Sequence, residues 1–178
     1  MEKRKFALKS KSWTTILTIP ALVFGAIVGV AQQGKTATPT ISCNTETDTP
    51  NVVATFAQGD KSIETIMLRF LPQYFSSQGA LKNCQTTADN LQTLYNADEM
   101  KYLASDTLEE HPVVCAVARR GVGCNHYNAQ LLFSVEKQVS PAKVLYDMLG
   151  DDFKESELPV PRTVSRIYTN LKPTWWPF

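Results

Sequence analysis

Apolar and polar residues follow two kinds of pattern along this chain, and each kind predicts a different element. Residues 52–57 (VVATFA) and 63–70 (IETIMLRF) are β-prone apolar runs separated by the turn residues 58–61 (QGDK), which predicts a β-hairpin. Between 81 and 95 the apolar positions recur at steps of three and four, as on one face of a helix. They are Leu81, Cys84, Ala88, Leu91 and Tyr95. The spacing therefore predicts that Cys84 points inward.

The second half of the chain again mixes strand and helix patterns. Further β-prone runs predict strands at 101–104, 112–118 and 131–135. Ser140 followed by Pro141 is typical of a helix start, the apolar positions between 144 and 149 share one face, and Gly150 ends the helix. The predicted order is β-β-α-β-β-β-α. The fold class is therefore α+β, a small antiparallel sheet with two helices.

The first 31 residues combine a basic stretch with an apolar run. Residues 1–12 are basic and residues 13–31 carry no charge, which is the plan of a secretory signal. Gly29 and Ala31 place small side chains at the −3 and −1 positions of a cut after Ala31. The charge-free run of 19 residues also has about the length that crosses a bilayer, so a retained signal anchor stays open beside cleavage, which we favour. Residues 32–40 are expected to be a flexible linker to the exported part.

The net charge of +1 conceals a difference between this leader and the rest of the chain. The leader holds five basic side chains and one acidic, whereas the remaining 147 residues hold 13 basic and 16 acidic. A net charge of −3 provides no general attraction for a phosphate backbone. We therefore expect no nucleic-acid partner.

The cysteines all follow the leader, and their even number indicates two disulfides in an oxidising compartment. They are Cys43, Cys84, Cys115 and Cys124. Three pairings are possible; we favour Cys115 with Cys124 across the short reversal at 119–123, which leaves Cys43 with Cys84. A zinc site of Cys84, Cys115, Cys124 and His126 is an alternative, but the closely spaced cysteine pair usual in structural zinc sites is missing.

Recognisable catalytic motifs are absent from the sequence, including nucleophile elbows, zinc-protease helices and phosphate-binding loops. The only histidines, His111 and His126, stand in turn-like contexts with no motif around them. We predict no catalytic, cofactor-binding or metal-binding residue and no cofactor. A small exported hydrolase that uses one of these histidines with a nearby acid is kept as an alternative.

The segment 151–178 differs from the preceding domain because it is acidic, then rich in proline, and ends on large aromatics. Trp175, Trp176 and Phe178 fall within four residues. Such a cluster is unusual as free surface, so it either packs on its own domain or docks onto a membrane interface or a partner. Both alternatives are open at this stage.

Several short elements stand in a familiar order. They are Cys43 in an entering strand, 74–76 (YFS) before Cys84, 91–95 (LQTLY), 101–103 (KYL), 112–117 (PVVCAV) and 131–135 (LLFSV). This arrangement resembles the COP23 domain, a cyanobacterial family named for a circadian-oscillating protein, over about residues 41–150. The chain departs from the family pattern at 67–70 (MLRF), where a Trp is usual, at 81–83 (LKN), where a Pro and Arg are usual, and at 109–111 (EEH), where an Asn-Gly is usual. Residues 151–178 lie outside the resemblance.

The resemblance implies an exported or membrane-associated protein of the periplasm or thylakoid lumen, without an assigned enzymatic activity. Together with the leader and the cysteines, it predicts a non-catalytic domain that acts by protein or membrane-surface contacts. Its expected partner is the membrane periphery or a membrane protein. A hydrolase and a zinc-binding module remain the alternatives.

Overall fold

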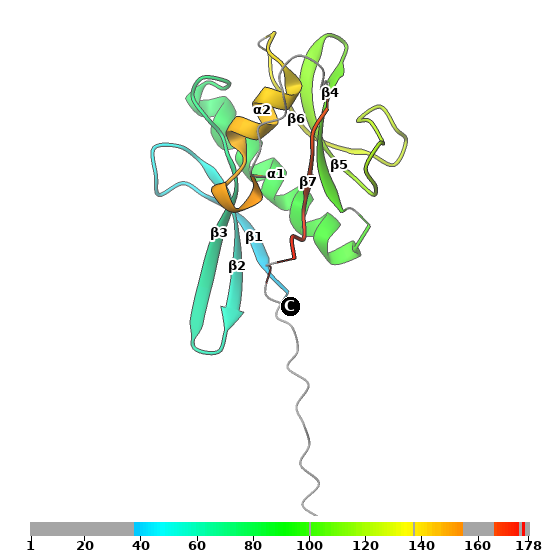
Figure 1. Cartoon of the computed structure of the whole chain (residues 1–178). Helices are drawn as coiled ribbons and strands as arrows, with labels where there is room; N and C mark the ends of the chain where they lie inside the picture. Colours follow the sequence, from blue (N-terminus) through cyan, green and yellow to red (C-terminus); the bar gives the residue numbers. More distant parts are fainter. Residues whose placement is uncertain (1–37, 100, 137, 155–165, 175, 177–178) are drawn as a thin grey trace, which may run out of the picture. The chain divides into compact units, whose positions relative to one another are not determined.

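The computed structural model describes residues 38–99, 101–136, 138–154, 166–174 and 176, all within one compact unit (Figure 1). The leader and residues 32–37 of the linker lie outside the described residues. The predictions of a cleaved or retained leader therefore stay predictions. The same holds for Trp175 and Phe178.

The first half of the domain builds a three-stranded antiparallel sheet in the order β1-β2-β3. Its strands are β1 (Thr40–Asn44), β2 (Asn51–Gln58) and β3 (Lys61–Arg69). The predicted hairpin is confirmed as β2 and β3, and Gly59 at its turn has a φ of +60°, which glycine adopts readily. The entering strand expected at Cys43, which the predicted order did not count, is β1, and it pairs along β2 with Cys43 opposite Val52.

A second antiparallel sheet has the order β6-β5-β4-β7, so the expected single sheet is two. Its strands are β4 (Tyr102–Leu108), β5 (His111–Val117), β6 (Gln130–Ser134) and β7 (Tyr168–Asn170). The last strand comes from the segment predicted to be a tail. It pairs with β4 through residues 102–104, which gives this short proline-flanked segment a place in the sheet.

Two helices accompany the sheets, as predicted, and the α+β class is confirmed. Helix α1 (Ser77–Ala97) begins after Ser76, whose hydroxyl accepts a hydrogen bond from the Gly79 N–H at 3.2 Å. Cys84 is fully buried on its inner face, whereas Leu81 is exposed at the rim of that face. Helix α2 (Pro141–Met148) starts at the predicted proline and is followed by the short 3₁₀ helix η1 (Asp151–Phe153).

The two predicted disulfides are present, with the favoured pairing. Cys43 of β1 is bonded to Cys84 of α1, and Cys115 of β5 is bonded to Cys124 beyond the end of that strand. Free cysteines are absent from the described residues. The zinc alternative is therefore wrong, since its thiolate ligands are consumed in the disulfides.

The main core joins residues of both sheets and both helices, and it includes Trp176 from the C-terminal segment. The indole is 2% exposed and contacts Phe56, Tyr95 and Phe153, with ring centroids 4.9, 6.1 and 5.5 Å away. Burial of an aromatic ring of this size contributes strongly to folding. Trp176 therefore packs on its own domain, and docking through this ring would require it to leave the core.

Candidate interaction site on the loop between β5 and β6

Residues 118–129 connect β5 to β6 and form the recognition loop, the name used below for this segment. Cys124 lies in the middle of the loop and is bonded to Cys115 in β5. The disulfide therefore fixes the loop to the sheet at a point nine residues along the chain from the strand cysteine. A cross-link of this kind restricts the shapes that a loop can adopt.

A buried carboxylate holds the same part of the loop from beneath. Asp106 of β4 accepts a hydrogen bond from the Cys124 N–H at 2.9 Å, and its Oδ2 lies 2.8 Å from the Arg166 guanidinium. Burial alone would raise the pKa of Asp106. The bonds from Arg166 and from the Thr107 and Cys124 backbone outweigh that effect and hold the pKa of this carboxyl below its usual value. Asp106 is therefore an ionised anchor for the loop.

The backbone at Gly123 passes very close to this ion pair. A Cβ atom at this position would lie 2.6 Å from Asp106 Oδ2 and 2.9 Å from an Arg166 nitrogen. Both distances are shorter than real carbon contacts allow, so the site accepts only glycine without a rearrangement. Gly123, interpreted from the sequence as a turn residue, is required for close approach of the loop to its anchor.

The C-terminal segment adds a second attachment. The Tyr168 hydroxyl of β7 donates a hydrogen bond to the Val122 carbonyl at 3.1 Å. On the other side of the loop, the Arg120 guanidinium lies 5.3 Å from the centre of the Tyr102 ring of β4, within cation–π range. Segments of the chain that are distant in sequence thus fix the base of the loop.

Bonds within the loop order its tip. The His126 N–H donates to the Gly123 carbonyl at 3.2 Å, and the Ala129 N–H donates to the His126 carbonyl at 2.9 Å. His126 Nδ1 accepts from the Asn128 N–H at 3.2 Å, and its ring centroid lies 4.3 Å from that of Tyr127. Tyr127 nevertheless remains 87% exposed. The result is an ordered tip that presents a large aromatic side chain to solvent.

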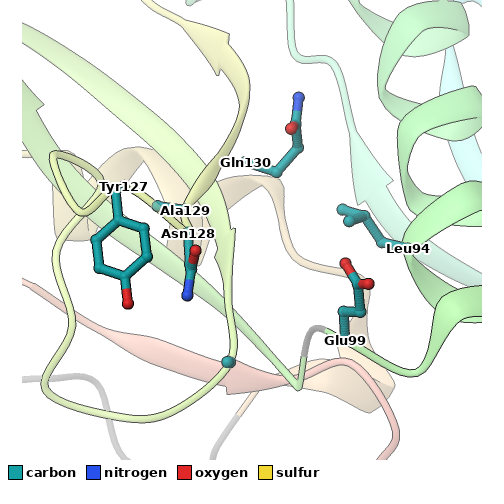
Figure 2. A pocket seen from close by; sticks show the side chains of 7 residues that line it. Leu94, Glu99, Tyr127, Asn128, Ala129 and Gln130 are labelled. Atoms are coloured by element: carbon teal, nitrogen blue, oxygen red, sulfur yellow. The ribbon is translucent and has the colours of Figure 1, made fainter.

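Beside Tyr127 the surface is hollowed between the loop and the end of α1. This larger hollow has a volume of about 490 Å³. Figure 2 shows Leu94 and Glu99 on one side of it and Tyr127, Asn128 and Ala129 on the other. The remaining lining residues are Ala118 and Gln130.

A smaller hollow of about 200 Å³ shares Ala118, Tyr127 and Asn128 with the first. Its other lining residues are Arg119, Val122 and His126. The larger hollow therefore carries an acidic group and the smaller one carries basic or ionisable nitrogen groups, with Tyr127 lining both. The two hollows adjoin each other at Ala118, Tyr127 and Asn128.

The histidines do not form a catalytic arrangement in the described part of the chain. His111 is the exposed first residue of β5, and His126 bonds within its own loop. Neither imidazole has a hydrogen bond or ion pair with an acid among the described residues. Groups of three or more potential metal ligands are also absent from those residues. Across the described ranges, the histidines therefore form neither an acid–base pair nor a metal centre.

Sequence reasoning assigned the site residues only in part. It placed Cys115 and Cys124 on either side of the short reversal at 119–123, but it gave no role to Tyr127, Asn128 or Asp106. The available signal was weak: a segment containing Gly, Asn, Arg and Tyr between two strands, with a cysteine inside it. Such composition is common at protein-binding loops.

Comparison with protein families is decisive for the family. A family model described as Circadian oscillating protein COP23 matches residues 40–175. The chain belongs to the COP23 family. The COP23 match extends beyond the expected limit at residue 150, so the expectation that the C-terminal segment lies outside the resemblance was wrong. Strand β7 and Tyr168, which hold the loop, fall within the COP23 match.

The comparisons with curated proteins and with solved structures identify no relative whose role could be compared. Neither a curated protein nor a solved structure matches this COP23 chain. Within the described residues, every helix is too short or too polar to cross a bilayer. The disulfides are compatible with an exported protein.

Proposed function

We propose that this COP23 protein is an exported, non-catalytic domain that binds another protein through the recognition loop. The observation that carries the proposal is the exposure of Tyr127 on a loop that is held in place by a disulfide and by the Asp106 carboxylate. Tyrosine and arginine are enriched among residues that dominate protein interfaces. A loop ordered before binding also loses less conformational entropy when a partner binds.

Protein contact is favoured over membrane contact by the chemistry of the loop. Its tip presents one tyrosine together with amides and polar groups, and the large exposed apolar residues that insert into a bilayer are few there. Trp176, the strongest candidate for membrane contact in the described residues, is buried. We therefore place the partner among proteins of the membrane periphery or membrane proteins with an exposed domain.

The proposed compartment is the periplasm or the thylakoid lumen of a cyanobacterium. Support comes from the signal-like leader and from two disulfides, which persist in oxidising compartments. The intact mass of the protein purified from its own cell envelope tests this proposal. A mass that starts at Gln32 with four oxidised cysteines is expected, whereas a reduced chain in the cytosol would contradict export. A retained leader would instead indicate a membrane anchor.

A hydrolase is not supported by a specific observation. His126 Nδ1 is occupied by the Asn128 N–H, and His111 lies at the start of β5. Catalysis by either histidine would require an acid or nucleophile within hydrogen-bond reach. We therefore develop only the binding function.

Photo-crosslinking in the cells of origin tests the binding function. The photoreactive amino acid benzoyl-phenylalanine replaces Tyr127 in the full chain, and in a control it replaces Asp60, an exposed residue in the β2–β3 turn. We expect a discrete crosslinked protein at position 127 and none at position 60. The same products at both positions, or none at either, would overturn the proposal.

A further inference from the structure

The larger hollow beside Tyr127 contains an acid that forms no ion pair within the described part of the chain. Among the described residues that line this hollow, only Glu99 is charged. The adjacent Asp98 is already paired with Lys172, whose hydrogen bond and charge lower the pKa of Asp98. By contrast, none of the ion pairs among the described residues involves Glu99. The Glu99 carboxylate is therefore available to a positive group from outside the chain.

The other lining groups fit the same kind of ligand. Tyr127 offers an aromatic ring, which attracts ammonium and guanidinium groups. Asn128 and Gln130 each carry an amide oxygen that accepts hydrogen bonds. Leu94 supplies an apolar wall beside Glu99, against which an aliphatic stem can lie (Figure 2). A long side chain with an apolar stem and a cationic end matches the chemistry of each of these groups.

We propose that the larger hollow receives an arginine or lysine side chain of the protein partner. This inference rests on the proposed binding function and specifies the chemistry of the partner. Arginine is expected to bind more tightly than lysine, because its planar group has five donors and stacks on aromatic rings. The ligand is thus a basic side chain in an exposed segment of the partner.

The different charges of the two adjoining hollows give the partner an orientation. Arg119 and His126 line the smaller hollow, and neither lines the larger one. A partner segment that lies across both hollows therefore meets an acid in one and basic groups in the other. We expect a basic residue and an acidic residue of the partner to flank its contact with Tyr127.

Peptide titration followed by NMR tests this inference on the full, disulfide-bonded chain. The probe is the blocked tripeptide Gly-Arg-Gly, and the control is Gly-citrulline-Gly, which has nearly the same shape but no charge. We expect the arginine peptide to shift the amide signals of Asn128 and Gln130 saturably, including their side-chain NH₂ groups. Equal shifts with the citrulline peptide, or none with either, would overturn the inference.

A matched pair of variants assigns the effect to Glu99. Glu99→Gln should weaken arginine-peptide binding by about three- to fivefold, as expected for a partly exposed charge pair. Glu110→Gln removes the same charge from the exposed β4–β5 turn and should change binding less than about twofold. Unchanged binding in Glu99→Gln would contradict the inference. Both residues are exposed, so both variants are expected to fold.

Two further results separate a protein side chain from a free polyamine as the occupant, and the inference about the basic side chain from the proposed binding function. Tighter binding of free spermidine than of the arginine peptide would contradict a protein side chain as the occupant. In the crosslinking experiment, Glu99→Gln is added to the protein that carries the photoreactive residue at position 127. An unchanged yield of the captured partner would contradict the inference about the basic side chain but would still support the binding function. Loss of specific capture at position 127 in the unmodified background would instead remove the binding function.

Discussion

The two disulfides connect regions of different character. Cys43–Cys84 joins β1 to α1 across a sequence separation of 41, and Cys84 is fully buried in the main core. Cys115–Cys124 joins β5 to the recognition loop across a separation of 9. The chain-entropy model gives about 4 kcal/mol for the longer closure and about 2.6 kcal/mol for the shorter one. The first bond is thus expected to contribute more to the stability of the fold, whereas the second also fixes the recognition loop to β5.

The surroundings of the two bonds differ in the same way. Around Cys43 and Cys84 the contacts are those of the apolar core, which extends to Trp176. Cys115 and Cys124 belong to a second, smaller apolar cluster. The loop around Cys124 is also held by directional polar contacts, from the Asp106 carboxylate to the Cys124 N–H and from the Tyr168 hydroxyl to the Val122 carbonyl. Apolar contacts favour compactness, whereas hydrogen bonds to defined atoms fix orientation. Hydrogen bonds thus orient the recognition loop in addition to its apolar packing, as the proposed binding function requires.

The largest stability effect is expected for the longer disulfide. Replacing both Cys43 and Cys84 by Ala should lower the free energy of unfolding by about 4 kcal/mol, because the unfolded chain regains the entropy of the closed segment. Urea denaturation of the variant and the parent protein measures the difference. If the free energy of unfolding falls less than in the Cys115/Cys124 variant, the longer disulfide is not the larger contributor to stability.

Loss of the buried indole should come next. Trp176→Ala should lower the free energy of unfolding by about 3 kcal/mol, near the lower end for a buried aromatic, because the C-terminal segment can detach locally. Urea denaturation again provides the measurement. A change below about 0.5 kcal/mol would mean that Trp176 is not part of the core in solution, and docking through this ring would have to be reconsidered.

Removal of the shorter disulfide should lower the free energy of unfolding by a smaller amount, and its effect should be confined to the recognition loop. The double change of Cys115 and Cys124 to Ala should lower the free energy of unfolding by about 2.6 kcal/mol. Hydrogen exchange should accelerate at residues 118–129 while protection of β2 and β3 stays as in the parent protein. Equal acceleration in both sheets would show that this bond supports the whole fold rather than the loop.

The Asp106 carboxylate should make the loop region sensitive to acid. Since folding lowers the pKa of Asp106, its contribution is fully present above the unfolded pKa of about 4 and is lost as pH falls through the folded value. Asp106→Asn should cost about 1–2 kcal/mol at pH 7 and reduce the loss of stability below pH 4. Asp60→Asn, at an exposed turn, is the control. The same pH dependence in Asp106→Asn and the parent protein would exclude this anchor.

The smallest stability effect is expected at the exposed tip. Tyr127→Ala should change the free energy of unfolding by less than about 0.5 kcal/mol, because the ring is 87% exposed. When added to the protein that carries the photoreactive residue at position 127, the Tyr127→Ala protein should nevertheless fail to reduce the yield of the crosslink, whereas the parent protein should reduce it. Tyr127→Phe retains the ring and should compete. A Tyr127→Ala protein that competes as well as the parent would contradict a role for the ring.

Features predicted from sequence are those set by local patterns. The hairpin and α1 follow from periodicities within single segments, and the pairing of Cys115 with Cys124 follows from a short reversal. Strand β7 was missed because it has three residues and forms only through pairing with β4, which is distant in sequence. Trp176 was left undecided because its burial depends on Phe56 and Phe153, from two other segments.

The candidate site was harder to predict than the fold for a related reason. Tyr127 belongs to no periodic pattern, and its exposure is a property of the folded loop. Asp106 lies two residues beyond the strand predicted at 101–104, and its pairing with Arg166 appears only when the C-terminal segment lies beside β4. Non-local polar contacts of this kind leave almost no trace in a single sequence.

The most direct test of the account measures crosslinking at position 127 in the two disulfide-deficient proteins, at a temperature where circular dichroism shows both to be folded. The account predicts that the Cys115/Cys124 variant loses the specific crosslink although it is the more stable of the two. The Cys43/Cys84 variant should keep the crosslink despite its larger loss of stability. Retention by the Cys115/Cys124 variant, together with loss in the Cys43/Cys84 variant, would contradict the assignment of recognition to the loop.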